Sequence, residues 1–304
     1  MLTFSSDEPL IVFGGPYSNL RATQAMKSEA ERLGIAPDRI ICTGDIVAYC
    51  AEPEETTALV RAWGVHVIAG NCEEQLAEGA ADCACGFEPG SACDVLAKGW
   101  YPFANARMSD ASRAWMAGLP KTVMMQYAGL RLRVIHGGVT QINRFLFASD
   151  QAALTEDFAL ADCDIVIAGH AGVPFITRLD GGLWFNPGVI GMPANDGTPE
   201  VWYGVIKHES GSVQVSTHRL AYDHQGAAAS LRRAGHADGY ARTLITGLWP
   251  SLDIFPPAER AATGVRLRRK SARFASARQV DSRRQLWSDA ECLRSRSKRP
   301  SPLT

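Results

Sequence analysis

Short apolar segments alternate with longer amphipathic ones over the first 70 residues of the chain. Apolar runs that end in Gly or in a Gly-polar pair, at residues 9–15, 38–45 and 65–71, predict three buried strands. Between them, apolar residues recur near helical spacing over residues 19–34 and 53–64, which predicts two helices. This alternation is typical of an α/β sheet, whose ligands bind outside the carboxyl ends of the strands.

The pattern changes beyond this region. Residues 74–120 are expected to be helical but less regular, and short strands are expected to follow. The predicted strands contain LRLRVIHGG, DIVIAGH, GLWFNPG, EVWYGVI and SVQVSTHRL. Short strands separated by turn residues suggest a second sheet packed on the first.

Charge is distributed unevenly along the chain. The formal net charge is −1, but the segment from Arg260 onward has 13 Lys/Arg and 3 Asp/Glu, so an acidic body precedes a basic end. We therefore expect a domain over residues 1–250 and a basic, largely disordered tail over residues 251–304. This tail could contact nucleic acid or anionic lipid. The basic segment from Arg260 onward has only Phe274 and Trp287 as aromatics and no recognised nucleic-acid module, so a solvated tail is the favoured interpretation.

Hydrophobic runs and cysteines indicate the compartment. No apolar run approaches the ~20 residues that span a membrane, and the first residues lack the pattern of a secretory signal. We expect a cytoplasmic protein without membrane partners. The eight cysteines are then expected to be reduced thiols or metal ligands.

Four potential metal ligands occur at the ends of predicted strands: Asp45, Asn71, His136 and His170. A carboxylate, an amide oxygen and two imidazoles suit a divalent Mn, Fe or Zn ion. Taken singly, a Gly-Asp or Gly-Asn pair after a strand is usually a turn, and a lone His is more often structural. Four of them at strand ends, each beside a glycine, favour a metal site.

The order and context of these motifs resemble the calcineurin-like metallophosphoesterases. The likeness is greatest to a small bacterial branch that reads GD-x-V-x-Y and then GNC[DE], and it covers roughly residues 9–250. It includes residues 186–197, which look like the family's NPGS-type turn. The resemblance implies an α/β fold: a four-layer αββα sandwich of two packed mixed β-sheets.

The family normally holds two metal ions. The resemblance implies that the ligand set of the second metal is complete here, as Asp45, Asn71, His136 and His170. The set of the first metal is not, because its Asp, its His and its last His fall on Gly15, Tyr17 and Gly172. Selective loss on one side suggests an altered site with one ion. Cys72 occupies the position at which many relatives have a His that assists the leaving group, so Cys72 joins Asp45, Asn71 and His136 as a candidate catalytic residue.

Other side chains could complete this site. Cys83, Cys85 and Cys93 form a C-x-C-x7-C cluster whose thiolates could replace the missing ligands for zinc or iron. Tyr17 could donate a phenol oxygen, or its ring could simply fill the vacated space. Asn143 and Arg144 could bind an anionic substrate, with a surface ion pair as the alternative for Arg144.

These observations favour a metal-dependent hydrolase that acts on a small-molecule phosphoester, either a phosphodiester or a phosphomonoester. Hydrolysis would use one divalent ion to activate water. Two alternatives stay open. One is a non-hydrolytic sensor or regulatory protein that binds metal or phosphate, and the other is a redox-type metal centre built with the cysteines.

Overall fold

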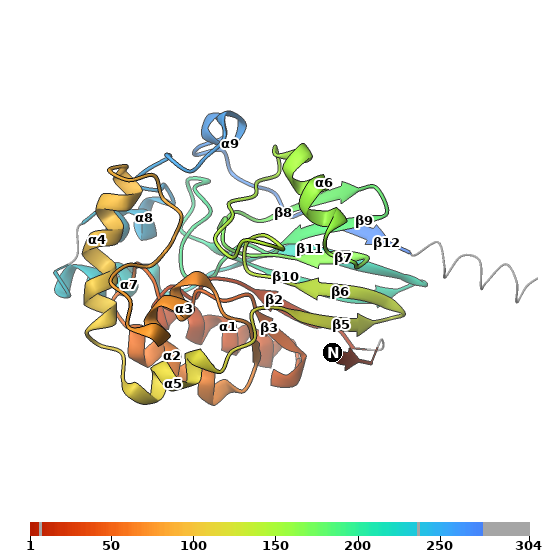
Figure 1. The fold of residues 1–304 in the computed structure, drawn as a ribbon, viewed down its shortest axis with the longest axis horizontal. Helices are drawn as coiled ribbons and strands as arrows, with labels where there is room; N and C mark the ends of the chain where they lie inside the picture. The colour runs from red at the N-terminus through yellow and green to blue at the C-terminus, as the bar shows by residue number, and fades with distance from the viewer. Residues whose placement is uncertain (6–7, 236–237, 276–304) are drawn as a thin grey trace, which may run out of the picture.

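The computed structural model of the chain describes residues 1–5, 8–235 and 238–275. Two six-stranded sheets pack against each other (Figure 1). The first sheet contains, in spatial order, β12 (Ser271–Phe274), β11 (Ser212–Leu220), β10 (Val201–Glu209), β2 (Leu10–Phe13), β3 (Ile40–Cys42) and β4 (His66–Val67). The second contains β1 (Leu2–Phe4), β5 (Val123–Tyr127), β6 (Leu130–Val134), β7 (Ile165–Ile167), β9 (Gly182–Asn186) and β8 (Phe175–Leu179).

Both sheets are mixed. In the first sheet, β2, β3 and β4 are parallel, whereas β10 runs antiparallel to β2. In the second, β6, β7 and β9 are parallel, and β5 and β8 pair with them antiparallel. The carboxyl ends of the parallel strands carry the loops that form the candidate site.

Helices complete the layers. The described helices are α1 (Leu20–Arg32), α2 (Pro53–Trp63), α3 (Asn71–Glu78), α4 (Ala92–Asn105), α5 (Asp110–Ala117), α6 (Gln151–Ala159), α7 (His224–Arg233), α8 (Asp238–Thr246), α9 (Pro257–Ala261) and the 3₁₀ turn η1 (Pro37–Arg39). Helices α1, α2 and α7 cover the first sheet and α6 covers the second, so the predicted αββα sandwich is confirmed (Figure 1).

Burial explains why the strands were recognisable from sequence. β2, β3 and β7 are short runs buried on both faces, and β11 alternates buried and half-buried positions. Val12 and Ile41 from one sheet pack between the layers against Leu132 and Ile165 from the other. The helix predicted over residues 19–34 begins where the Asn19 side chain accepts a hydrogen bond from the backbone N–H of Ala22.

Described contacts with the body continue beyond residue 250, where the sequence predicts the start of a tail. Strand β12 pairs antiparallel with β11, and the Leu267 N–H donates to Asp196 Oδ2 at 3.0 Å. Phe255 is buried against the body. The basic composition of this segment suggests a solvated tail, but Lys and Arg are also common on exposed edges of sheets. Residues 276–304 of the predicted tail lie outside the described residues.

Among the described residues, no helix combines the length and apolar character needed to cross a membrane.

Candidate metal centre

Three strand ends bring Asp45, His136 and His170 together at the seam between the two sheets. Asp45 follows β3 of the first sheet, while His136 and His170 follow β6 and β7 of the second. Asp45 and His170 both adopt the left-handed backbone conformation, each with φ of 55°. Asp and His tolerate this conformation better than most residues. The sharp turns after the strands direct both side chains into one buried cluster.

The three side chains form a compact ligand set. One potential ligand atom from each lies within 4.8 Å of the other two. His136 Nε2 is 3.2 Å from Asp45 Oδ2 and 3.1 Å from His170 Nδ1. Asp45 Oδ2 is 3.9 Å from His170 Nδ1. A carboxylate and two imidazoles at this spacing are a suitable donor set for a divalent ion.

The backbone carbonyl of Thr43 orients His136. It lies 2.6 Å from His136 Nδ1, so this nitrogen carries the hydrogen and donates it. His136 Nε2 therefore faces the cluster. A carbonyl behind the ring of a histidine is the usual way in which proteins fix a metal-binding tautomer.

Mutual electrostatics set the protonation of the cluster. Burial raises the pKa of Asp45, but the adjacent His136 and His170 outweigh it and leave this pKa below its ordinary value. Burial lowers the pKa of His136, but the Asp45 carboxylate and the Thr43 carbonyl bring it above its ordinary value. Burial, together with the charge of His136, lowers the pKa of His170 to about 3. His170 is thus neutral near pH 7, as a metal ligand must be.

Asn71 is the first residue of α3 and lies beside this cluster. Its Nδ2 donates to the Cys83 carbonyl at 2.8 Å. Its Oδ1 is buried and has no hydrogen-bond partner among the described residues, and the same holds for His170 Nε2. An unpaired buried oxygen costs free energy unless something binds it. Its position next to the Asp-His-His set fits a cation, so the residues present suit the divalent ion that the sequence predicts.

Glycine allows the turn before α3 to approach the cluster. A Cβ at Gly70 would lie 2.3 Å from Asp45 Oδ1 and 2.9 Å from His136 Cε1. Any side chain at Gly70 would therefore displace the two ligands. Glycine is needed at position 70 because there is no room for a Cβ, and not because the backbone has an unusual φ.

Glu73 is a supporting residue to which sequence analysis assigns no role. Its buried carboxylate accepts backbone N–H bonds from Asp45 at 2.7 Å, Ile46 at 2.8 Å and Gly70 at 2.8 Å. Burial and the nearby Asp45 carboxylate raise the pKa of Glu73 to about 7. Glu73 joins the Asp45 turn to the start of α3. The only signal for it in the sequence is the acidic position of the GNC[DE] motif.

The cysteines are arranged differently from the predicted thiolate cluster. Cys83 and Cys85 form a disulfide, with their Cα atoms 5.3 Å apart. The expectation that both are free ligands is therefore wrong, because the C-x-C turn brings the two sulfurs within bonding reach. Cys85 Sγ lies 3.5 Å from Asn71 Nδ2, so the disulfide adjoins the candidate ligand. Cys93 is a free cysteine that lines a separate aromatic pocket.

Cys72 is buried beside the site. Its backbone N–H lies 3.4 Å from Asp45 Oδ1, and its Sγ lies 3.6 Å from Asn71 Nδ2. Burial, followed by the charges of Asp45 and Glu73, raises the pKa of the Cys72 thiol well above its ordinary value. The thiol is therefore protonated near pH 7, and its sulfur can take part only in weak hydrogen bonds, such as the one that it accepts from Asn71 Nδ2.

Tyr17 fills space on one side of the centre. Its ring packs on Gly15, where a Cβ would come within 2.5 Å of Tyr17 Cζ, and it meets the Tyr49 ring at 4.8 Å. Burial, with the Asp45 charge, raises the pKa of its phenol well above the ordinary value. Tyr17 thus contributes a neutral aromatic wall.

The two predicted substrate-binding residues have protein partners. Asn143 Nδ2 donates to the Ala84 carbonyl at 2.8 Å and so holds the disulfide segment. Arg144 pairs with Asp157 at 2.9 Å and with Glu156 at 3.3 Å. The ion-pair interpretation of Arg144 thus matches the geometry, although Asp157 is fully buried.

Comparison with known proteins identifies relatives of this fold and site. Residues 18–211 match the family model described as the calcineurin-like phosphoesterase superfamily domain. The chain is 23% identical over 232 residues to "Uncharacterized protein MJ0912" of Methanocaldococcus jannaschii. The aligned residues cover 70% of this chain and 88% of that protein.

Two solved structures share the fold. One is a metallophosphoesterase from Sphaerobacter thermophilus, with a TM-score of 0.63 and 21% identity over 80% of this chain and 100% of that one. The other is the hypothetical protein PH1004 from Pyrococcus horikoshii OT3, with a TM-score of 0.67 and 14% identity over 81% of this chain and 100% of that one.

Proposed function

Because the chain belongs to the calcineurin-like phosphoesterase superfamily, we propose that it is a hydrolase of small phosphoesters that uses one divalent ion. The observation that carries this proposal is the buried Asp45–His136–His170 cluster, whose ligand atoms lie within 4.8 Å of one another. Beside it lies the Asn71 oxygen, which has no hydrogen-bond partner within the described part of the chain. These four residues would hold the ion. Their mixed oxygen and nitrogen donors suit Mn, Fe or Zn.

When bound, a divalent ion supplies Lewis-acid chemistry that polarises a phosphoryl oxygen and makes water more acidic. The chain's own residues prepare the site for it. Asp45 supplies negative charge, and Thr43 fixes the His136 ring so that Nε2 faces the cluster. Phe145 lies against His170 with ring centroids 4.3 Å apart and gives that imidazole an apolar neighbour.

A second candidate function is a metal- or phosphate-binding regulator without turnover. It is favoured by the residues at the positions of the missing first-metal ligands. Tyr17 covers Gly15, and the Trp249 indole lies near Gly172, where a Cβ would be 3.0 Å from its ring. Without a second ion, the two-metal clamp on the phosphate is lost.

Turnover assays with matched variants separate these functions. Chelator-stripped protein that is reloaded with Mn²⁺ is expected to hydrolyse p-nitrophenyl phosphate or its bis ester. Asp45→Asn and His136→Ala are expected to lower the rate by at least ~100-fold, because they remove ligands themselves rather than residues that support ligands. The exposed Asp180→Asn and His208→Ala serve as controls and should leave the rate unchanged.

Either outcome is informative. A rate lost in both cluster variants and kept in both controls excludes the regulator. Metal-loaded protein that turns over no member of a broad phosphoester panel contradicts the hydrolase, and retained binding of inorganic phosphate would then support the regulator.

A further inference from the structure

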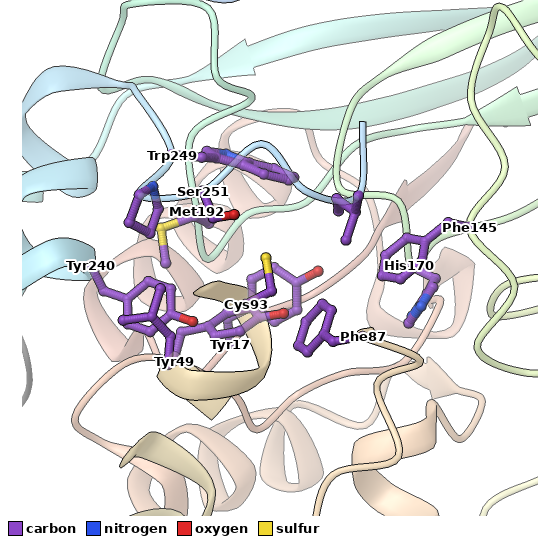
Figure 2. A pocket seen from close by; sticks show the side chains of 13 residues that line it. Tyr17, Tyr49, Phe87, Cys93, Phe145, His170, Met192, Tyr240, Trp249 and Ser251 are labelled. Carbon is purple, nitrogen blue, oxygen red and sulfur yellow. The ribbon is translucent and has the colours of Figure 1, made fainter. Parts of the chain in front are cut away.

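An aromatic pocket lies next to the metal centre and touches it at His170 (Figure 2). The space open to the centres of water-sized molecules is about 50 Å³, and about 530 Å³ is free of atoms when the solvent at its open mouth is counted. Six of its lining side chains are aromatic rings: Tyr17, Tyr49, Phe87, Phe145, Tyr240 and Trp249. Of the 13 described residues that line it, none is Lys, Arg, Asp or Glu. The pocket is therefore open, aromatic and without a formal charge beyond its border with the cluster.

Its walls are organised as two aromatic groups that face each other. Tyr49 meets Tyr17 at 4.8 Å and Tyr240 at 5.0 Å between ring centroids. On the other side, Phe145 contacts the His170 ring at 4.3 Å and stacks with Phe87 at 6.0 Å. Figure 2 shows the tyrosines opposite Phe87, Phe145 and His170, with the hollow between them.

Trp249 forms a third wall and is held firmly. Its backbone N–H donates to Asn195 Oδ1 at 2.8 Å, its Nε1 donates to the Pro193 carbonyl at 2.5 Å, and its ring stacks on Phe255 at 4.8 Å. The indole lies near Gly172, and Tyr17 packs on Gly15. The three positions at which the sequence lacks metal ligands thus lie in or beneath the walls of this pocket.

We propose that this pocket binds a planar aromatic group on the alcohol side of the substrate and holds it beside the metal centre at His170. The proposal rests on the proposed function, since the metal centre would hold the phosphoryl group. Aromatic faces on three sides favour stacking with a ring. A pocket without a cationic wall cannot neutralise a second anionic group, which disfavours substrates whose alcohol portion is anionic.

Binding of non-hydrolysable phosphonates tests this proposal directly. Phenylphosphonate and methylphosphonate carry the same anionic group and differ in the ring. In Mn²⁺-loaded protein, isothermal titration calorimetry is expected to show at least about tenfold tighter binding of phenylphosphonate, from stacking and burial of the ring. Adenosine 5′-monophosphate is the third ligand to be titrated. Tighter binding of this nucleotide than of phenylphosphonate would assign the ring to a nucleobase, and weaker binding would assign it to a simple aryl group.

Matched variants locate the effect. Trp249→Leu and Leu96→Gln alter the pocket wall and are expected to reduce the phenyl-to-methyl preference to about threefold or less, while methylphosphonate binding is retained. Val95→Gln changes the adjacent, 60% exposed residue of α4 and should keep the full preference. Thermal unfolding of each variant verifies that it is folded, and Leu96→Gln keeps the test open if Trp249→Leu does not fold.

The outcomes separate this proposal from the proposed function. Equal binding of both phosphonates in Mn²⁺-loaded wild-type protein overturns the aromatic pocket and leaves the metal-dependent hydrolase intact. If no phosphonate binds, phenol serves as a probe without a phosphoryl group. Phenol binding that Trp249→Leu or Leu96→Gln weakens would then uphold the ring site while the proposed function fails, and its absence would overturn both.

Discussion

Glu73 connects the Asp45 turn to α3, and its removal should destabilise the fold. Glu73→Gln replaces one carboxylate oxygen with an amide N–H₂ that faces backbone donors, since Glu73 accepts from Asp45, Ile46 and Gly70. We expect a loss of about 1–3 kcal/mol in the free energy of unfolding, measured by urea denaturation.

The neighbouring residue provides the control for this change. Glu74 forms a salt bridge with the exposed Lys121, so Glu74→Gln should cost less than about 1 kcal/mol. Equal effects of the two substitutions would show that the buried carboxylate of Glu73 has no special role.

Protonation of His136 should make metal affinity depend on pH. The raised pKa of His136 means that the metal-free cluster holds a proton between His136 and Asp45, and a divalent ion must displace it. Affinity for Mn²⁺ should therefore rise as the pH increases through the pKa of His136, by up to about tenfold per pH unit below it. His170, with its pKa lowered to about 3, is already neutral and adds no proton.

Calorimetry in two buffers of different ionisation enthalpy measures this linkage. We expect release of close to one proton per bound Mn²⁺ below the pKa of His136 and progressively fewer above it. An affinity that is constant between about pH 6 and pH 8, with no proton released, would contradict the assignment of His136 as the group that exchanges its proton for the ion.

Whether a site residue can be predicted from the sequence depends on whether its signal is local or arises from the packing of separate loops. Asp45, His136 and His170 can be proposed from sequence because each stands at a strand end beside a glycine, which is a local signal, and the structure brings the three together. The partners of Glu73 and the disulfide contact of Asn71 depend on how separate loops pack, and no local pattern encodes this. The same reason explains why the sequence alone suggests free thiols at Cys83 and Cys85, which form a disulfide in the structure.

At the scale of elements, the segment between α3 and α4 supports Asn71. The Cys83–Cys85 disulfide crosslinks this segment, and Asn143 Nδ2 holds it by donating a hydrogen bond to the Ala84 carbonyl. The double substitution Cys83→Ser/Cys85→Ser should loosen this segment and weaken Mn²⁺ binding about tenfold, as expected when the partners of a metal ligand are lost.

The half-buried free cysteine Cys163 offers a control outside this segment. Cys163→Ser should leave the Mn²⁺ affinity unchanged. Unchanged affinity in the double variant as well would show that the position of Asn71 does not depend on the disulfide.

The predicted elements were those with a strong local period. The buried strands β2, β3 and β7 and the helices α1 and α2 appear where the sequence predicts them. Strand β12 is not predicted, because this short, partly exposed strand lies in a basic segment that looks like a solvated tail until β11 provides a partner. A strand of this kind is specified by its neighbour rather than by its own composition.

At the scale of the whole molecule, residues 265–275 should contribute to stability. Arg219 donates to Asp196 at 2.6 Å and to the Leu267 carbonyl at 2.7 Å, which fixes the approach to β12. A chain that ends at Gly264 should unfold at a Tm lower by roughly 5 °C or more, measured by calorimetry.

A chain that ends at Ala275 keeps every described contact of this segment and is the control. If the two shortened chains have equal Tm values, the packing of β12 on β11 contributes nothing to stability.

The aromatic pocket also belongs to this scale. It joins Tyr17, near the start of the chain, to Trp249, which follows α8 (Figure 2). The family resemblance suggests that Gly15, Tyr17 and Gly172 stand where relatives have metal ligands, and the assembled fold places aromatic rings around these positions. The proposed replacement of a second ion by an aromatic wall therefore depends on residues from distant parts of the chain.

Metal stoichiometry tests the central claim most directly. Protein purified from Mn-, Fe- and Zn-supplemented medium would be analysed by inductively coupled plasma mass spectrometry, with the Asp45→Asn variant alongside. We expect close to one divalent ion per chain in the wild-type protein and close to none in the variant. Two ions per chain, none in the wild type, or one that persists in Asp45→Asn would contradict a one-metal centre at Asp45, Asn71, His136 and His170.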